Sequence, residues 1–381
     1  MAAHAATGTQ TASSQAASSS AFALSPLATI AVASLYVALY TSNAILMKLS
    51  RDPISGKYEY NPVAVTLMNE SLKLAVSCVM IPPEAIADTG EALAWNNVWP
   101  YAVPGLVYLV DDNLQYGIYY YLKPSEATLW ANVRVLTTAV VFRLLIGREL
   151  KYLQWISLLV LTVGLVLAHD SGGSHAHGDA LTALTPTPPP PPPARVIAAQ
   201  ENESVAGFLG LNVGHMLVLL VAVVGSFGNV FGERLLKREL EQSLHLQNAK
   251  LYFWGVVLNL VAFLWYGWAS ESVNVGSVLH GWNLWTFCLV FVQAAIGLTI
   301  SVIFKFLDNI FKVQVSSLGF LATVLSTAFL FGAKPTRHFY VGAALVLGSV
   351  YAYNLSKSQK PSPSQSTSQK GTQQLSMEQH C

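Results

Sequence analysis

Long apolar stretches recur along the chain, separated by short polar or proline-containing segments. Each stretch is about 20 residues long, which is the length that an α-helix needs to cross a bilayer. We predict ten such helices, over residues 25–47, 61–81, 99–121, 125–146, 152–169, 205–232, 249–269, 282–303, 310–332 and 337–355. The pattern therefore predicts an all-α polytopic membrane protein.

The composition supports this prediction. Of the 381 residues, 53% are hydrophobic and only 11% are charged, against about 25% charged in an ordinary soluble domain. The formal net charge is +1, so no global field attracts the protein to nucleic acid. Cys78 and Cys288 lie in apolar stretches and Cys381 ends the chain, so no disulfide framework is indicated. The expected partner is the lipid bilayer, and no nucleic acid is expected.

A long linker divides the predicted helices into two halves. It carries six consecutive prolines, which favour a semi-rigid polyproline spacer. Each half has five helices, and an odd number inserts the second half upside down relative to the first, as in many transporters. We therefore predict two inverted repeats. The predicted segments are a disordered tail over 1–24, repeats over 25–169 and 205–356, the linker over 170–204 and a second disordered tail over 357–381.

The distribution of Lys and Arg predicts the orientation. Cytosolic loops of membrane proteins carry an excess of these residues. With both termini cytosolic, the richer side includes Arg148, Lys237, Lys305 and Lys312. The linker then lies in the lumen or outside the cell.

Several charges lie inside predicted helices, where a charged side chain costs about 2.5–3.5 kcal/mol on insertion scales. Glu70 and Lys73 are three residues apart, so they share a helix face and can pair. A purely structural, self-neutralising pair is the alternative to a functional one. Asp111 and the adjacent Asp112 interrupt the third helix, and the alternative for them is a position in water at the helix mouth.

Arg134 lies deep in the fourth predicted helix, while Lys305 and Asp308 lie near the end of the eighth, spaced to pair. The alternative for Lys305 is a cytosolic anchor. Two fixed cations, one from each half, suit a dianionic or phosphorylated solute, because Arg offers a planar fork to phosphate oxygens and Lys a point charge. Nearby Asn and Tyr side chains could bind hydroxyl groups and stack on a base.

No enzyme, cofactor or metal is predicted. The sequence has no phosphate-binding loop, zinc-protease motif or paired nucleophile and base. His175 and His177 lie in the Gly- and Ser-rich linker, without fixed geometry for a metal. Gly225, Gly228 and Gly232 have the wrong spacing for a dinucleotide loop, and we predict close helix packing through Gly228 and Gly232.

Seven stretches along the chain have a recognisable order and spacing. They are Glu70-Ser-Leu-Lys-Leu, Val103-Pro-Gly-Leu-Val-Tyr with Asn113-Leu, Leu136-Thr-Thr-Ala to Arg148, Gln154-Trp-Ile-Ser-Leu, Glu233-Arg-Leu-Leu-Lys, Gln247-Asn-Ala-Lys-Leu-Tyr-Phe-Trp-Gly and Gly297 to Asn309. Together they resemble the nucleotide-sugar transporter family, in the branch of the UDP-galactose and CMP-sialic acid carriers. The resemblance covers residues 25 to 355 and is closest to members described as probable UDP-sugar transporters.

The resemblance implies the drug and metabolite transporter architecture and an antiporter. A cytosolic nucleotide sugar, a UDP-sugar first of all, would exchange for the luminal nucleoside monophosphate across the Golgi membrane, or alternatively the endoplasmic reticulum membrane. It implies Lys305 and Arg134 as phosphate contacts. The other implied substrate contacts are Tyr108, Asp112, Asn113, Asn248, Tyr252 and Asn309, with Glu70, Lys73 and Asp308 as structural or coupling charges.

The chain also departs from the family pattern. Arg134 stands where Lys is usual, Ala127 and Ala131 replace two tyrosines, and Trp254 replaces a small residue. Two alternative functions therefore stay open, namely a carrier of another phosphorylated metabolite and a non-transporting Golgi scaffold. A homo-oligomer is also an open alternative.

Overall fold

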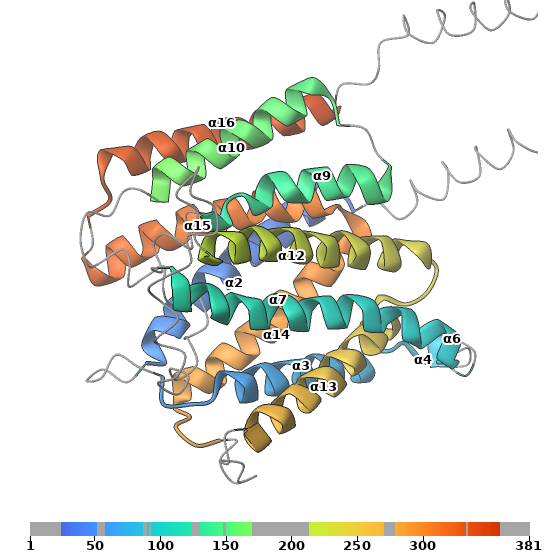
Figure 1. The fold of residues 1–381 in the computed structure, drawn as a ribbon. Helices are drawn as coiled ribbons and strands as arrows, with labels where there is room; N and C mark the ends of the chain where they lie inside the picture. The colour runs from blue at the N-terminus through green and yellow to red at the C-terminus, as the bar shows by residue number, and fades with distance from the viewer. Residues whose placement is uncertain are drawn as a thin grey trace, which may run out of the picture.

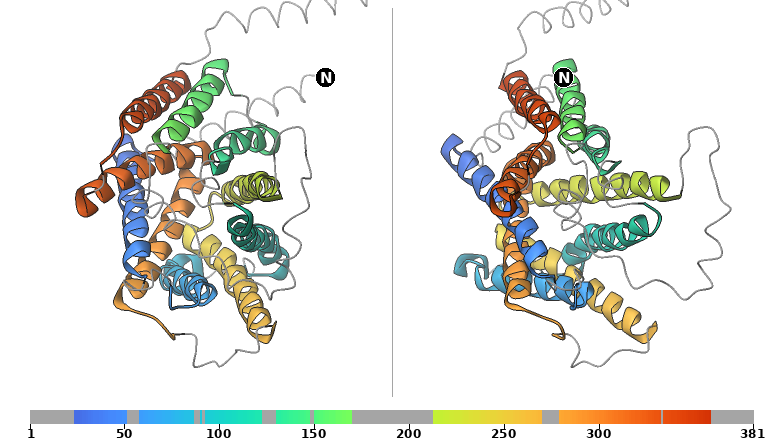
Figure 2. Two further views of the ribbon diagram at one scale, coloured as in Figure 1. Left: turned by 60° about the vertical axis from the view of Figure 1, so that its left-hand side comes forward. Right: turned by 90° about the vertical axis from the view of Figure 1, so that its left-hand side faces the viewer.

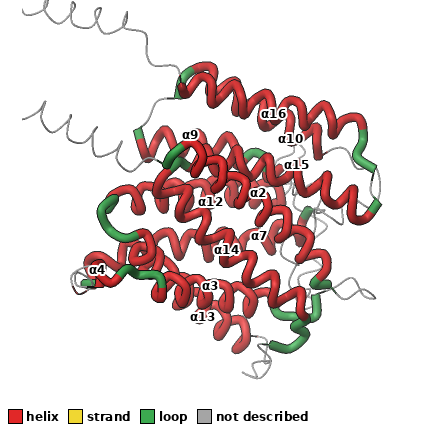
Figure 3. Tube along the Cα trace, turned by 180° about the vertical axis from the view of Figure 1, so that it is seen from behind, coloured by secondary structure: helices red, strands yellow, loops and turns green. Residues whose placement is uncertain are grey.

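The computed structural model is built from helices (Figure 1; Figure 3). It describes residues 24–51, 58–86, 93–122, 130–147, 150–169, 213–269, 279–332 and 334–358, together with Gly90, and no strand occurs among them. The predicted linker, most of both predicted tails and the histidines assigned to the linker lie outside these described residues.

The long helices of the described chain overlap the ranges predicted from the apolar pattern, but several ends differ. They are α2 (Pro26–Leu49), α3 (Pro62–Val79), α7 (Ala102–Tyr121), α9 (Arg134–Ile146), α10 (Tyr152–His169), α12 (Val213–Arg238), α13 (Leu244–Ala269), α14 (Leu284–Phe306), α15 (Asn309–Phe331) and α16 (Arg337–Ser358). The short segments α4 (Pro83–Ile86), α6 (Trp95–Val98) and η1 (Trp99–Tyr101) precede α7. The sixth long helix extends to Arg238 and the seventh begins at Leu244. The fourth begins at Arg134, so this residue lies at a helix start, and the prediction that it lies deep within the helix is wrong.

Seven described helices are long and apolar enough to cross a membrane, namely α2, α10, α12, α13, α14, α15 and α16. The chain is therefore a polytopic membrane protein.

Local sequence signals set several helix ends. Ser25 accepts a hydrogen bond from the backbone N–H of Ala28 and Pro26 follows at the first helical position, where proline's missing N–H costs nothing. Asn61 and Pro62 begin α3 in the same way. Gly147 ends α9 with φ of 73°, a left-handed conformation that favours glycine.

The helices form two walls and two end pairs (Figure 2). In one wall, α7 and α9 pack on α12; in the other, α14 and α15 pack on α2. The pair α10–α16 closes one end of the bundle and the pair α3–α13 the other (Figure 1). The largest buried apolar cluster lies around α9, α10, α15 and α16 and includes Phe142, Leu158, Leu321 and Phe339.

Glycine allows the backbones of α10 and α16 to touch. A Cβ atom added to Gly342 would collide with the backbone nitrogen of Ala168 and would lie 2.5 Å from the carbonyl oxygen of Gly164. Small residues at such crossings are how membrane helices approach closely without a hydrophobic driving force. A Cβ atom added to Gly348, on the same helix, would meet no atom within 4 Å.

We expect Gly342→Ala to destabilise the bundle, because the new methyl group collides with backbone that cannot rotate away. Overpacking of this kind costs about 1–3 kcal/mol. Thermal unfolding of the purified protein in detergent should show a lower Tm. The matched control is Gly348→Ala, which should leave Tm unchanged or raise it, because alanine favours a helix. Equal Tm values for the two variants would contradict the packing argument.

Candidate functional site

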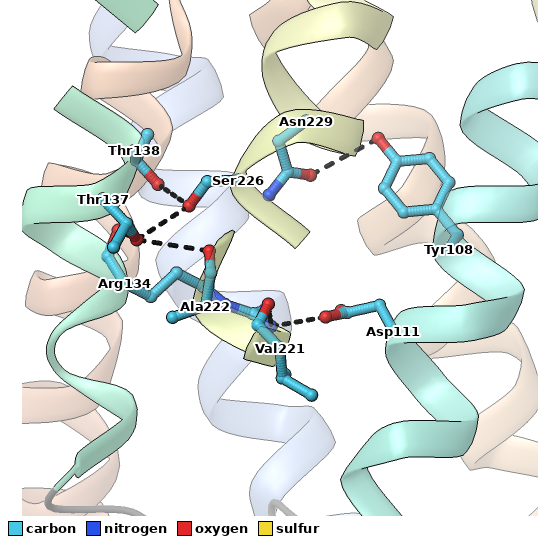
Figure 4. Close-up of polar contacts among 9 residues, drawn as sticks. All are labelled: Tyr108, Asp111, Arg134, Thr137, Thr138, Val221, Ala222, Ser226 and Asn229. Atoms are coloured by element: carbon cyan, nitrogen blue, oxygen red, sulfur yellow. Dashed lines mark hydrogen bonds and ion pairs between the residues drawn. The ribbon is translucent and has the colours of Figure 1, made fainter. Parts of the chain in front are cut away.

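An ion pair joins α7 and α9 across α12 (Figure 4). The Arg134 Nη2 atom lies 2.7 Å from Asp111 Oδ1 and also donates a hydrogen bond to the Val221 carbonyl at 3.1 Å. The Asp111 side chain is 9% exposed, whereas the Arg134 side chain is 33% exposed. The carboxylate is therefore buried, whereas the guanidinium side chain is partly exposed.

Glycine on α12 makes room for this ion pair. A Cβ atom at Gly225 would lie 2.7 Å from both Arg134 Nη2 and Asp111 Oδ1. At Gly228 it would lie 2.8 Å from Val107 Cγ1 on α7. The prediction of close helix packing is confirmed at Gly228, and at Gly232 a Cβ atom would lie 3.3 Å from the Tyr108 hydroxyl. The absence of a side chain at Gly225 also lets two charges meet beside the α12 backbone.

Hydroxyl groups fix α9 against α12 beside Arg134. Ser226 Oγ lies 3.1 Å from Thr137 Oγ1 and 2.8 Å from Thr138 Oγ1, and Thr137 also donates to the Ala222 carbonyl at 3.2 Å. These bonds hold the first turn of α9, and with it the backbone of Arg134. The Tyr108 hydroxyl donates to Asn229 Oδ1 at 3.4 Å (Figure 4).

A second cation approaches from the opposite wall. Lys312, in the first turn of α15, interacts electrostatically with both Arg134 and Asp111. Its Nζ atom lies 5.6 Å from the centre of the Phe304 ring. The distribution of charges along the sequence assigns Lys312 to the cytosolic surface, so its place beside Arg134 was missed. Its position three residues after Asn309, on the same helix face, was the available signal.

Lys305 has a different environment. It is 4% exposed, and its Nζ atom donates to the Gln242 carbonyl at 2.5 Å and to Gln247 Oε1 at 3.0 Å. Gln247 in turn donates to the carbonyls of Leu236 at 3.1 Å and Glu239 at 2.7 Å. The ammonium group of Lys305 therefore fastens the connection between α12 and α13.

Asp308 forms the start of α15 and pairs with α16. Its Oδ1 atom accepts from the Phe311 N–H at 2.7 Å, and its Oδ2 atom lies 2.8 Å from Lys357 Nζ. Spacing alone predicts Lys305 as the partner, and the structure places Lys357 there. Burial by itself raises the pKa of Asp308, but Lys357, the Phe311 N–H and Lys237 together hold the pKa below its ordinary value.

The predicted pair of Glu70 and Lys73 is confirmed, with Lys73 Nζ 2.5 Å from Glu70 Oε1. Lys73 Nζ also lies 4.5 Å from the centre of the Tyr252 ring, a cation–π geometry. The Tyr252 hydroxyl lies 3.0 Å from Ser301 Oγ, and Tyr252 also interacts electrostatically with Tyr108. The pair of Glu70 and Lys73 therefore supports the ring of Tyr252.

Two of the predicted asparagines are buried with unsatisfied side chains. Asn248 is 1% exposed and Asn309 is 0% exposed. Among the described residues, Asn248 Oδ1 and both polar side-chain atoms of Asn309 have no hydrogen-bond partner. Because buried amides are nearly always bonded, these groups are suited to a ligand. The side chains of Asp112 and Asn113 lie outside the described part of the structure, so their roles stay predictions.

Trp254, which departs from the family pattern, is held by the segment before α7. Its indole N–H donates to the Val98 carbonyl at 3.0 Å, and its ring lies 5.6 Å from the ring of Trp95. The side chain therefore has a fixed structural contact of its own.

The unequal burial of the ion pair predicts unequal effects of mutation. Arg134→Gln leaves the buried Asp111 carboxylate without its hydrogen-bond donor, so it should destabilise the protein by about 1–3 kcal/mol. Asp111→Asn leaves the more exposed Arg134, which water can solvate, so it should lower Tm less. The exposed Glu241→Gln variant is the control for charge change. A larger loss for Asp111→Asn than for Arg134→Gln, measured by thermal unfolding in detergent, would contradict this assignment.

Known proteins resemble this chain over most of its length. It is 28% identical to CMP-sialic acid transporter 1 of Oryza sativa subsp. indica, over 84% of this chain and 92% of the relative. It is 26% identical to the probable UDP-sugar transporter protein SLC35A4 of Xenopus tropicalis, over 84% of this chain and 89% of that relative. One crystal structure aligns with a TM-score of 0.54 and 15% identity, covering 87% of this chain and 98% of that chain, which indicates a shared fold.

The family model for nucleotide-sugar transporters matches residues 24–354. This range includes all the long helices of the described chain except the last residues of α16. It also includes the charge pairs described above, except that Lys357, the partner of Asp308, lies beyond it. The chain belongs to the nucleotide-sugar transporter family.

Proposed function

We propose that the protein is an antiporter that carries a UDP-sugar from the cytosol into the Golgi lumen, with the endoplasmic reticulum as the alternative compartment. A nucleoside monophosphate leaves in exchange. The observation that carries the proposal is that two cations from opposite walls, Arg134 on α9 and Lys312 on α15, are near enough to interact electrostatically with each other and with Asp111.

These two cations suit the phosphates of a nucleotide. A guanidinium binds phosphate oxygens through a planar fork, and an ammonium adds a compact charge. Because Arg134 and Lys312 belong to different halves of the chain, a phosphate between them would bind both halves at once. Movement of one half against the other could then open the site to each side in turn, which is alternating access.

The packing of the helices supports ten spans in two inverted repeats. When the five long helices of the first half are exchanged in order for those of the second, the main contacts exchange too. The pairs α3–α13 and α10–α16 map onto themselves. The contacts of α12 with α7 and α9 map onto those of α2 with α14 and α15, and α7–α13 maps onto α3–α14. Five helices per half make the two halves opposite in orientation.

The nucleoside is assigned to the groups beside the cations. Tyr108 and Tyr252 offer rings for stacking, and the unsatisfied amides of Asn248 and Asn309 can bond to base or ribose. Asp112 and Asn113 stay in the predicted set. Glu70, Lys73 and Asp308 hold the surrounding helices. We assign the phosphates to Lys312 in place of Lys305, because the ammonium of Lys305 already has two acceptors.

The transport proposal predicts exchange by the pure protein. Liposomes that contain the protein and are preloaded with UMP should take up a labelled UDP-sugar, because the loaded nucleotide drives counterflow. The panel should include UDP-, CMP- and GDP-sugars, and liposomes without UMP or without protein are the controls. Uptake of a CMP-sugar without uptake of any UDP-sugar would show that the carried base is cytosine and not uracil. If no member of the panel exchanges, the transporter proposal is wrong and a scaffold role gains support.

The two lysines should respond differently to substitution. Lys312→Ala should keep its Tm while exchange falls about ten- to a hundred-fold, the usual effect of losing a charged hydrogen bond. Lys305→Ala should lower Tm, because it releases Gln242 and Gln247, while the folded fraction still exchanges. Uptake and thermal unfolding measured on the same preparations separate these effects. If Lys305→Ala instead loses exchange at an unchanged Tm while Lys312→Ala still exchanges, the phosphate contact is Lys305, as the sequence predicts.

A further inference from the structure

Asp111 occupies the place where the cations would bind an anionic solute. Its Oδ1 atom lies 2.7 Å from Arg134 Nη2, and its carboxylate also interacts with Lys312. The carboxylate comes from α7 and the cations from α9 and α15, so three helices contribute to one cluster of charges. The protein thus carries its own anion between the cations that suit a phosphate.

The cationic partner of the pair remains partly exposed. The Asp111 side chain is 9% exposed, whereas the Arg134 side chain is 33% exposed. A guanidinium has five N–H donors. Among the described residues, the side-chain hydrogen bonds of Arg134 involve only its Nη2 atom. Arg134 therefore keeps donors for a ligand while Asp111 holds its position.

We propose that Asp111 is a tethered counter-anion that competes with the phosphate of the substrate. The inference rests on the proposed function and extends it to the control of affinity and release. In the empty carrier, the Asp111 carboxylate pairs with the Arg134 guanidinium. When substrate binds, its phosphate displaces the carboxylate from the guanidinium. When the nucleotide leaves, the carboxylate pairs with Arg134 again. A competitor that is part of the protein acts at a fixed, high effective concentration.

The competition makes opposite predictions for binding and turnover. Removing the charge of Asp111 should tighten binding of a phosphate-bearing ligand, because the cations are then always available. If Arg134 is free of Asp111 about a tenth of the time, the apparent affinity should rise about tenfold. The same change should lower kcat, because no carboxylate helps to expel the bound nucleotide. A loss of structure alone would instead raise KM.

The test compares the wild-type protein with Asp111→Asn and with Asp111→Ser, a second neutral variant in case the first does not fold. Glu241→Gln is the matched control, because it removes one negative charge at an exposed position. Binding of UMP and of uridine is measured on the purified protein in detergent, and KM and kcat are measured by UMP-loaded exchange. Thermal unfolding reports whether each variant is folded.

The expected result is about tenfold tighter UMP binding by Asp111→Asn, with unchanged uridine binding and lower KM and kcat. Glu241→Gln should match the wild type in all of these. Unchanged or weaker UMP binding by folded neutral variants would overturn the inference. If the wild-type protein neither binds UMP nor exchanges it, the proposed function fails separately. Inorganic pyrophosphate then serves as the probe. Equal binding of pyrophosphate by the wild type and by Asp111→Asn would overturn the proposed role of Asp111 as a counter-anion.

Discussion

A charge inside a membrane protein needs either an opposite charge or hydrogen-bonding groups as partners, and this requirement constrains how the helices of this bundle meet. Arg134 pairs with Asp111, Lys73 with Glu70, and Lys237 with Glu233 at 2.6 Å. The pair of Arg134 joins two helices, so α7 cannot shift against α9 without exposing the Asp111 carboxylate to an apolar environment. Charge pairing is therefore a constraint on packing as well as on electrostatics.

The same constraint explains where glycine is needed. Gly225 lies against the Arg134 ion pair, and Gly255 and Gly297 lie against Glu70 and Lys73 respectively, each with a Cβ position less than a normal contact distance from a charged side chain. Two paired side chains fill more space than a single apolar one, so the neighbouring helix has no room for a side chain of its own at that point. Small residues and charge pairs thus occur together in this bundle.

The sequence was most informative where the signal was local. Apolar length located the helices, and three-residue spacing identified the Glu70–Lys73 pair. It was least informative where a partner lies far along the chain. Lys357 is 49 residues from Asp308, and Asp111 meets Arg134 because of the rotation of α7, which no spacing reveals. The position of Lys312 near a helix start is equally typical of a cytosolic anchor.

The break between α14 and α15 explains how two nearby lysines come to have different surroundings. In one continuous helix, Lys305 and Lys312 would lie two turns apart on nearly the same face. The chain instead leaves α14 at Leu307 and starts α15 at Asn309, and α12 satisfies the backbone groups that this exposes: Lys237 donates to the Leu307 carbonyl, and Glu233 accepts from the Asn309 N–H at 2.8 Å. Backbone freed in a membrane needs such partners. Because α12 also carries Gly225, the same helix contacts both the break between α14 and α15 and the ion pair of Arg134, so a shift of α12 would disturb both together.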